Sequence, residues 1–152
     1  MVAALQTNLT RVITYRQPVE SLIHSLGATI SSHNMSHYAK GTRFEISQLR
    51  DEKQSELLAY LIDKLKSTKN SQGVSLFEQT TLAYGSNIRT SHTLRDCPVI
   101  IAGNNNLFKH GVHHHLASGT PMCNLWLTLL KANGISLDKF GDSNGLVEQV
   151  LA

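Results

Sequence analysis

The chain has 152 residues, of which 41% are hydrophobic and 16% are charged, and its formal net charge is +3. This length and composition are typical of a globular domain with a buried core and exclude a disordered chain. The positive residues are scattered and form no basic stripe, so we expect no nucleic-acid partner. No segment approaches the ~20 apolar residues of a membrane span. Cys97 and Cys123 lie in apolar contexts and are expected to be buried free thiols.

The first half of the chain predicts helices and one strand. Residues 1–9 carry a helical apolar pattern, residues 11–15 (RVITY) predict a strand, and a loop and short helix are expected over 17–26. In residues 42–67 apolar side chains recur mostly every three or four positions, with charges between them. This pattern predicts an amphipathic helix that packs one face on a sheet, with Thr42 or Ser47 as its N-cap.

Two apolar runs follow, TLAYG at 81–85 and PVIIAG at 98–103. Each is rich in strand-forming residues and ends at glycine, which fits strands buried on both faces. The helix predicted at 42–67 lies between the strand predicted at 11–15 and the run at 81–85. A helix between two buried strands is the βαβ pattern, so the predicted fold class is α/β, with a mostly parallel sheet flanked by helices. A second helix is expected over 120–134, with Thr120 as N-cap and Gly134 ending it, and a short helix over 146–152.

The loop between the two runs, residues 86–98, is dense in polar side chains: Ser86, Asn87, Arg89, Ser91, His92, Arg95 and Asp96. Open α/β sheets place their ligands at strand ends, where this loop is expected. A solvated loop has the same composition, so both interpretations stay open here.

The histidines give the candidate metal ligands. His33 and His37 are four residues apart, so on a helical turn both imidazoles project from one face. A catalytic zinc site usually takes three protein ligands, and His92 in the strand-end loop is the natural third. The alternative is a loop with exposed or capping histidines. The run His113–His115 is interpreted as a solvated loop, because consecutive residues of an extended segment point to alternating sides.

Hydroxyl and amide groups near these histidines are the candidate substrate contacts: Ser36, Ser86 and Asn87. Either serine could orient a phosphate or sulfate oxygen, or act as a nucleophile if a base or metal activated it. No GxSxG elbow, Walker loop or GxGxxG motif is present, so the catalytic residues stay unknown.

Five ordered segments carry a family resemblance: HNMSHY, AYGSN, SHTLRDCPVIIAGN, GTPMCNLWLTLL and KFGDSNG. In this order they resemble the bacterial family of unknown function named for its HxxSHH motif. That family looks like a branch of the alkaline-phosphatase-like superfamily, which contains phosphatases and sulfatases. The resemblance implies that residues 1–152 are a single partial domain of this fold, the C-terminal part of a larger protein.

The same resemblance gives the candidate site a meaning. In the superfamily an acidic residue and a histidine four positions later bind one metal, and here His33 and His37 resemble that pair. Ser86 and Asn87 fall where an Asp-His pair would lie, and His92 resembles a later histidine ligand. Tyr38 and Leu94 depart from the pattern, since relatives carry histidine at both positions.

The function that the resemblance implies is metal-dependent hydrolysis of phosphate or sulfate esters, with zinc as the expected metal and a small-molecule ester as substrate. The alternative is a non-catalytic binding or structural module that keeps the fold without the full metal centre, so enzyme status stays open. A homo-oligomer or a missing N-terminal half is the expected partner. The N-terminus does not resemble a signal peptide, whereas the resemblance implies a periplasmic or exported full-length protein.

Overall fold

The computed structural model describes residues 1–38, 40–86 and 88–152. These residues form two compact units, the first comprising residues 1–76 and 86–97 and the second comprising residues 77–85 and 98–152. Each unit has its own buried core. That residues 1–152 are a single partial domain stays a prediction. None of the helices in the described part of the chain combines the length and apolar character that a membrane span requires, as expected.

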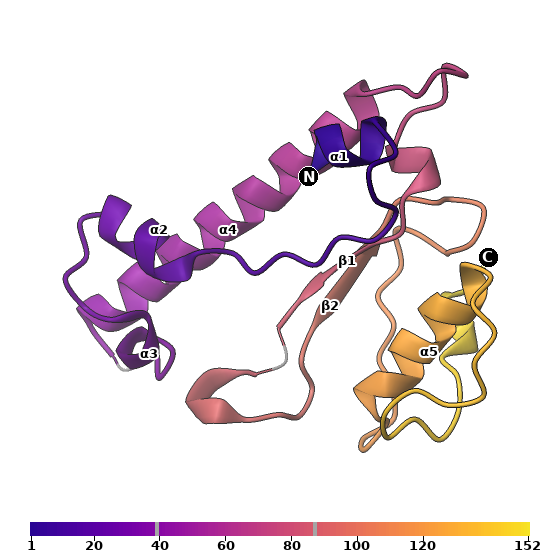
Figure 1. The fold of residues 1–152 in the computed structure, drawn as a ribbon. Helices are drawn as coiled ribbons and strands as arrows, with labels where there is room; N and C mark the ends of the chain where they lie inside the picture. Colours follow the sequence, from indigo (N-terminus) through magenta and orange to yellow (C-terminus); the bar gives the residue numbers. More distant parts are fainter. Residues whose placement is uncertain (39, 87) are drawn as a thin grey trace. The chain divides into compact units, whose positions relative to one another are not determined.

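The first unit is built on one long helix, α4 (Thr42–Ser67), which confirms the predicted bounds of this element. Three short helices pack against α4: α1 (Val2–Gln6), α2 (Val19–Ser25) and α3 (Ser32–Met35). Figure 1 shows α2 and α3 beside the N-terminal part of α4 and α1 beside its C-terminal part. Within this unit the neighbours of α4 are therefore helices, and the predicted packing on a parallel sheet is wrong.

The N-terminus of α4 differs from the prediction. Gly41 is the N-cap residue, and no side chain makes a capping hydrogen bond. Ser47 is instead fully buried on the helix, where its Oγ donates to the carbonyl oxygen of Met35 at 2.9 Å. A serine in a helix interior is favourable only when its hydroxyl has a partner, so this contact explains the position of Ser47.

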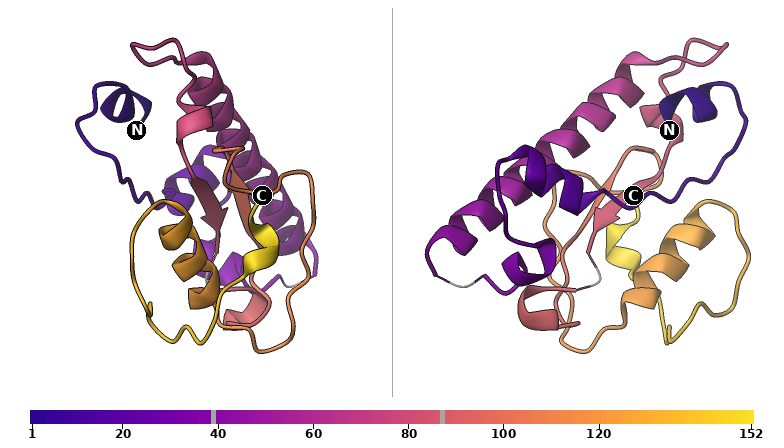
Figure 2. Two further views of the ribbon diagram at one scale, coloured as in Figure 1. Left: turned by 90° about the vertical axis from the view of Figure 1, so that its right-hand side faces the viewer. Right: turned by 60° about the vertical axis from the view of Figure 1, so that its left-hand side comes forward.

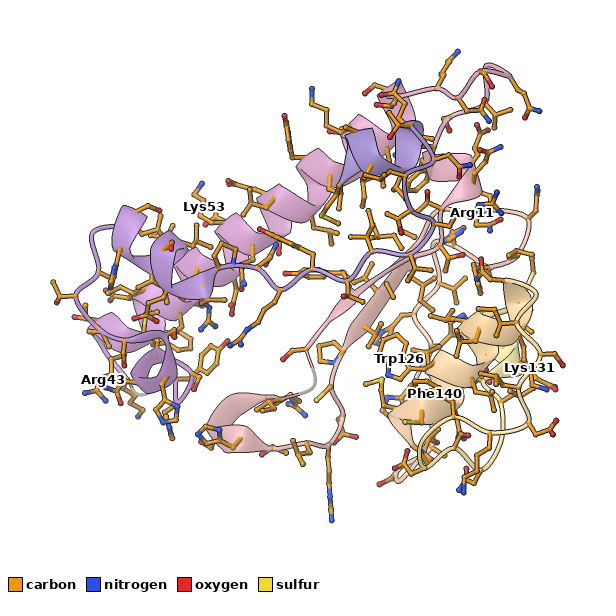
Figure 3. All side chains as sticks on the ribbon, in the orientation of Figure 1. Arg11, Arg43, Lys53, Trp126, Lys131 and Phe140 are labelled. Atoms are coloured by element: carbon orange, nitrogen blue, oxygen red, sulfur yellow. The ribbon has the colours of Figure 1, made fainter. Side chains whose placement is uncertain are left out.

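Only part of the predicted apolar face of α4 is buried. Leu58 and Leu65 are buried, whereas other apolar residues of the helix, Phe44, Leu49 and Leu57, are exposed. Arg43 and Lys53 lie on the same helix (Figure 3). The short helices are too small to cover the full length of a 26-residue helix, so its remaining apolar residues lie at the surface of this unit.

A small cluster joins α2, α3 and α4. Ile23 and Met35 are fully buried and Ala28 nearly so, and Val19, Ile30 and Ile46 pack against them. Burying a side chain of the size of isoleucine or methionine contributes about 1.5–3 kcal/mol to the free energy of folding. The burial of this cluster therefore stabilises the packing of α3 on α4.

Residues 11–15 form no strand in the structure. Val12 is 75% exposed and Tyr15 is 62% exposed, so the segment runs over the surface. A strand exists only with a partner, and no described residue pairs with this segment. The expected βαβ unit therefore lacks its first strand.

The second unit contains the only sheet in the described residues. It has two strands, β1 (Leu82–Gly85) and β2 (Val99–Ala102), paired antiparallel with Leu82 opposite Ala102. The predicted mostly parallel sheet, and with it the alkaline-phosphatase-like fold class, is wrong. The two apolar runs pair with each other because residues 86–98 turn the chain back, with no crossover helix between them. Nor are the strands buried on both faces, since Ile100 is 51% exposed.

Gly103 ends β2 in the left-handed region, at φ 79°. A Cβ atom at this position would overlap the carbonyl oxygen of Thr80, so only glycine fits here. The helix predicted over 120–134 is confirmed as α5 (Met122–Ala132). Its N-cap residue is Pro121, without a side-chain bond, and Gly134 with φ 83° follows its C-terminal end as predicted.

The core of the second unit lies between α5 and the C-terminal segment. Its buried members are Phe108, Leu125, Leu129, Val147 and Val150. Figure 2 shows the short 3₁₀ helix η3 (Glu148–Val150) in yellow beside α5, which agrees with the terminal helix predicted for 146–152. Two further 3₁₀ turns are present, η1 (Phe77–Gln79) and η2 (Thr90–His92), and η2 belongs to the first unit.

Candidate metal centre

The first histidine of the centre, His33, lies on α3. Ser31 caps this short helix by accepting from the backbone N–H of Asn34 at 3.4 Å, and the backbone N–H of Ser32 donates to Glu20 Oε2 at 3.1 Å. Hydrogen bonds from the Ser32 side chain and backbone lower the pKa of the Glu20 carboxyl. Both contacts satisfy N–H groups that a helix leaves free at its start.

His37 lies in the turn after α3, two residues past Met35. Met35 between the two histidines is fully buried, which leaves the imidazoles of His33 and His37 on the exposed side. Their ring centroids are 5.3 Å apart. The two histidines, four residues apart, lie on one face of the turn and the methionine between them lies on the other, which is the helical spacing that the prediction used.

A hydrogen-bonded network on α4 holds the residue after His37. The Tyr38 hydroxyl donates to Asp51 Oδ2 at 2.7 Å and accepts from Arg50 Nη2 at 2.8 Å, and Arg50 Nη2 also contacts Asp51 Oδ1 at 2.6 Å. Burial, followed by the hydrogen bond to Asp51, raises the pKa of the Tyr38 phenol. Tyr38 therefore stays protonated as a donor at neutral pH. Its backbone has φ 50°, an unfavourable value for a tyrosine that the network offsets.

His92 reaches the centre from the connection between β1 and β2. It is the last residue of η2, and its backbone N–H donates to the carbonyl oxygen of Arg89 at 3.1 Å. The N–H of Arg89 in turn donates to the carbonyl oxygen of Thr93 at 2.8 Å. Ser91 and His92 are consecutive residues with φ of 54° and 63°. Each such conformation costs about 1–3 kcal/mol in a residue with a side chain.

The three predicted histidines lie together in the first unit. The ring of His92 is 5.0 Å from that of His33 and 5.1 Å from that of His37, centroid to centroid. Each ring offers one nitrogen, and these three nitrogens lie within 4.8 Å of one another. All three residues are exposed. The predicted location at the edge of a parallel sheet is wrong, because the side chains come from α3, the turn that follows it, and η2.

The predicted substrate contacts are arranged differently. Ser36 is half-buried beside His33, and its Oγ donates to the carbonyl oxygen of His33 at 2.7 Å. Ser86 Oγ donates to the carbonyl oxygen of Ile88 at 2.7 Å and accepts from its N–H, so this hydroxyl shapes its own turn. Asn87 lies outside the described residues. No interaction within the described part of the chain joins Ser86 to the three histidines.

The remaining histidines and the cysteines do not join the cluster. His113 and His115 are exposed as expected of a solvated loop, whereas His114 is half-buried and its Nε2 atom has no hydrogen-bond partner among the described residues. Cys97 and Cys123 are free, as predicted, but half-buried rather than buried.

Sequence reasoning missed the residues that position the centre. The sequence predicts Ser47 only as a possible helix cap and assigns no role to Arg50 or Asp51. A signal was present in the helical spacing, since Ser47 and Asp51 are four residues apart and share one side of α4. Nothing in the sequence indicated that this side faces α3.

No family model, no curated protein and no solved structure matches this chain. The resemblance to the HxxSHH family therefore stays a prediction. What the centre can do chemically rests on its own three imidazoles.

Proposed function

We propose that this protein binds one divalent transition-metal ion through His33, His37 and His92, with zinc as the first choice. The supporting observation is the convergence of three exposed imidazole nitrogens within 4.8 Å. Neutral imidazole suits zinc, copper and nickel, and three protein ligands leave a coordination position for water or substrate.

The observed spacing is compatible with coordination after a small adjustment. At a Zn–N distance of about 2.0–2.1 Å, tetrahedral geometry places ligand nitrogens about 3.3 Å apart. Because no two of the nitrogens are more than 4.8 Å apart, closing the triangle to that spacing moves each nitrogen inward by at most about 0.9 Å. Because the three side chains are exposed, rotation about their χ angles can supply this movement without repacking a core.

Hydrolysis of phosphate or sulfate esters is the activity that this centre would support. Zinc held by three histidines lowers the pKa of its bound water to about 7 and polarises an ester oxygen. Within this chain, Ser36 lies between His33 and His37 in the sequence, and it would orient a substrate oxygen only after its hydroxyl turns away from the carbonyl oxygen of His33. The substrate class is a small anionic ester.

Metal binding without catalysis is the second candidate, and the exposure of the centre favours it. Catalytic sites gain from excluding water, whereas all three histidines are open to solvent. The cluster also contains no carboxylate among the described residues, so no acidic general base accompanies the imidazoles.

A zinc titration of the purified chain by calorimetry tests the binding proposal. We expect one zinc ion per chain, and at least about tenfold weaker binding in each of H33A, H37A and H92A, since each removes one of three ligands. H113A is the matched control, because His113 is exposed and outside the cluster. Equal zinc affinity in the wild type and all three variants would remove the proposed site.

Turnover separates the two candidates. Zinc-loaded wild-type protein is assayed with aryl phosphate and aryl sulfate esters, beside zinc-loaded H113A and H92A. Hydrolysis that H113A keeps and H92A loses supports an esterase. Stoichiometric zinc binding with no hydrolysis of either ester supports the binding module.

A further inference from the structure

The connection that carries His92 has few contacts of its own. The described residues of the connection are 86 and 88–97, and among those whose side chains are described only Cys97 is not exposed. Leu94, an apolar residue, is 72% exposed. Apolar burial, the usual force that fixes a segment on its neighbours, is therefore weak here.

In the described part of the connection, the backbone hydrogen bonds are local. The N–H groups of Arg89 and His92 bond within the turn, and Ser86 bonds to Ile88. The ion pair of Arg89 with Asp96 is also internal and spans 3.8 Å between exposed groups. Among the described residues, the recorded interactions that join this segment to the helices of the first unit are the ring contacts of His92 with His33 and His37.

The conformation at the tip is also unfavourable. Ser91 and His92 both have positive φ, and Asp96 does as well, at 53°. Residues with side chains keep such conformations only where the surroundings fix them. Among the described residues neither burial nor a hydrogen bond to α3 fixes them, which leaves the imidazole of His92 as the group through which they are held.

We propose that the bound metal fixes residues 88–97 onto α3 through His92 and that these residues are released when the metal leaves. We call this role of the metal the clip. This inference rests on the proposed metal site and gives that site a structural role. Coordination bonds from one ion to His33, His37 and His92 close a loop between His37 and His92, which are 55 positions apart in the sequence. Such a closure restricts the open chain in the same way as a covalent cross-link.

Trypsin cleavage sites in the connection can report whether residues 88–97 are fixed. Arg89 and Arg95 are exposed on either side of His92 and are trypsin sites. Arg11 is an exposed trypsin site in the first unit, outside the connection, and serves as the internal reference. The measured quantity is the rate of cleavage after Arg89 and Arg95 divided by the rate after Arg11. Because both rates come from one digest, a direct effect of zinc on trypsin cancels.

Limited trypsin digestion followed by mass spectrometry tests the clip, with zinc binding of the same samples measured by calorimetry. Zinc should lower the ratio about tenfold or more in the wild type and in H113Q, as expected when a local opening is suppressed. H92Q, which keeps a polar side chain but loses the ligand, should show the high ratio of the metal-free wild type with and without zinc.

The failures of the two proposals are distinguishable. Zinc that binds through the three histidines but leaves the cleavage ratio unchanged overturns the clip and leaves the metal site standing. Absence of zinc binding overturns both. A low ratio in metal-free wild-type protein overturns the clip as well, because the segment would then be fixed without the metal.

Discussion

Tyr38 connects the candidate ligand His37 to the long helix. Its hydroxyl lies between Asp51 and the guanidinium of Arg50, and its ring packs edge-on against Phe44 with 6.5 Å between centroids. These contacts fix the direction in which the chain leaves the α3 turn. At the scale of single residues, the histidine spacing could be predicted from the sequence, whereas this network could not, because it joins residues 12 and 13 positions apart.

We expect Y38F to destabilise the first unit by about 1 kcal/mol, since it removes a hydrogen bond to a charged group while Arg50 still satisfies part of Asp51. Urea unfolding followed by circular dichroism gives the difference. Y60F is the matched control, because Tyr60 is 61% exposed on α4, the helix of Arg50 and Asp51, and its ring, which contacts Lys64, is kept. Equal unfolding midpoints of Y38F and Y60F would contradict a positioning role for the Tyr38 hydroxyl.

Among the elements, α4 was predicted with its correct bounds because no proline or glycine interrupts residues 42–67 and apolar side chains recur at helical spacing. The strand partners were not predictable in the same way. An apolar run shows that a strand is favourable but not which strand it pairs with, and TLAYG and PVIIAG pair with each other. The 11–15 run has the composition of a strand and no partner.

Ser47 gives a prediction for the contact between α3 and α4. In S47A the Met35 carbonyl oxygen loses its hydroxyl donor but keeps the N–H of Tyr38, so we expect a loss of about 1 kcal/mol in unfolding free energy. S55A on the exposed side of α4 should be neutral within about 0.5 kcal/mol, since it only loses a bond to its own helix. Urea unfolding compares the two variants. A loss in S55A as large as that in S47A would contradict the assignment of the loss to the contact between Ser47 and Met35, because alanine is itself the better helix former.

Thr128 on α5 gives the corresponding prediction for the second unit. Its buried Oγ donates to the carbonyl oxygen of Asn124 at 2.7 Å and accepts from the N–H of Val147 at 2.8 Å. T128V keeps the shape and leaves the Val147 N–H without its acceptor, so we expect a loss of about 1–3 kcal/mol. Unfolding followed by the fluorescence of Trp126 on the same helix measures it. T128S, which keeps the hydroxyl, should lose less, and the reverse order would contradict the hydrogen-bond explanation.

At the scale of the whole molecule, the sequence predicted a sheet protein and the structure has two units, the first of them helical. The error arose because the predicted topology needed a strand before α4 and parallel pairing after it. The grouping of His33, His37 and His92 does not depend on that topology, since local helical spacing provides one pair and the β1–β2 connection provides the third residue.

Binding of metal to the folded state should stabilise the protein. Zinc at 100 times its dissociation constant is expected to add about 2.7 kcal/mol to the free energy of unfolding, and excess EDTA should reverse the gain. Thermal unfolding by circular dichroism with and without zinc measures the effect. The gain should be kept in H113A and lost in H92A, and a gain of equal size in H92A would place the stabilising zinc elsewhere.

The coordination of zinc tests the account most directly. X-ray absorption of the zinc-loaded wild type should show three imidazole nitrogens at about 2.0–2.1 Å and an oxygen or nitrogen atom as the remaining ligand. H92A should show one imidazole fewer. A zinc shell containing sulfur from Cys97 or Cys123, or a shell that is unchanged in H92A, would contradict a centre built from His33, His37 and His92.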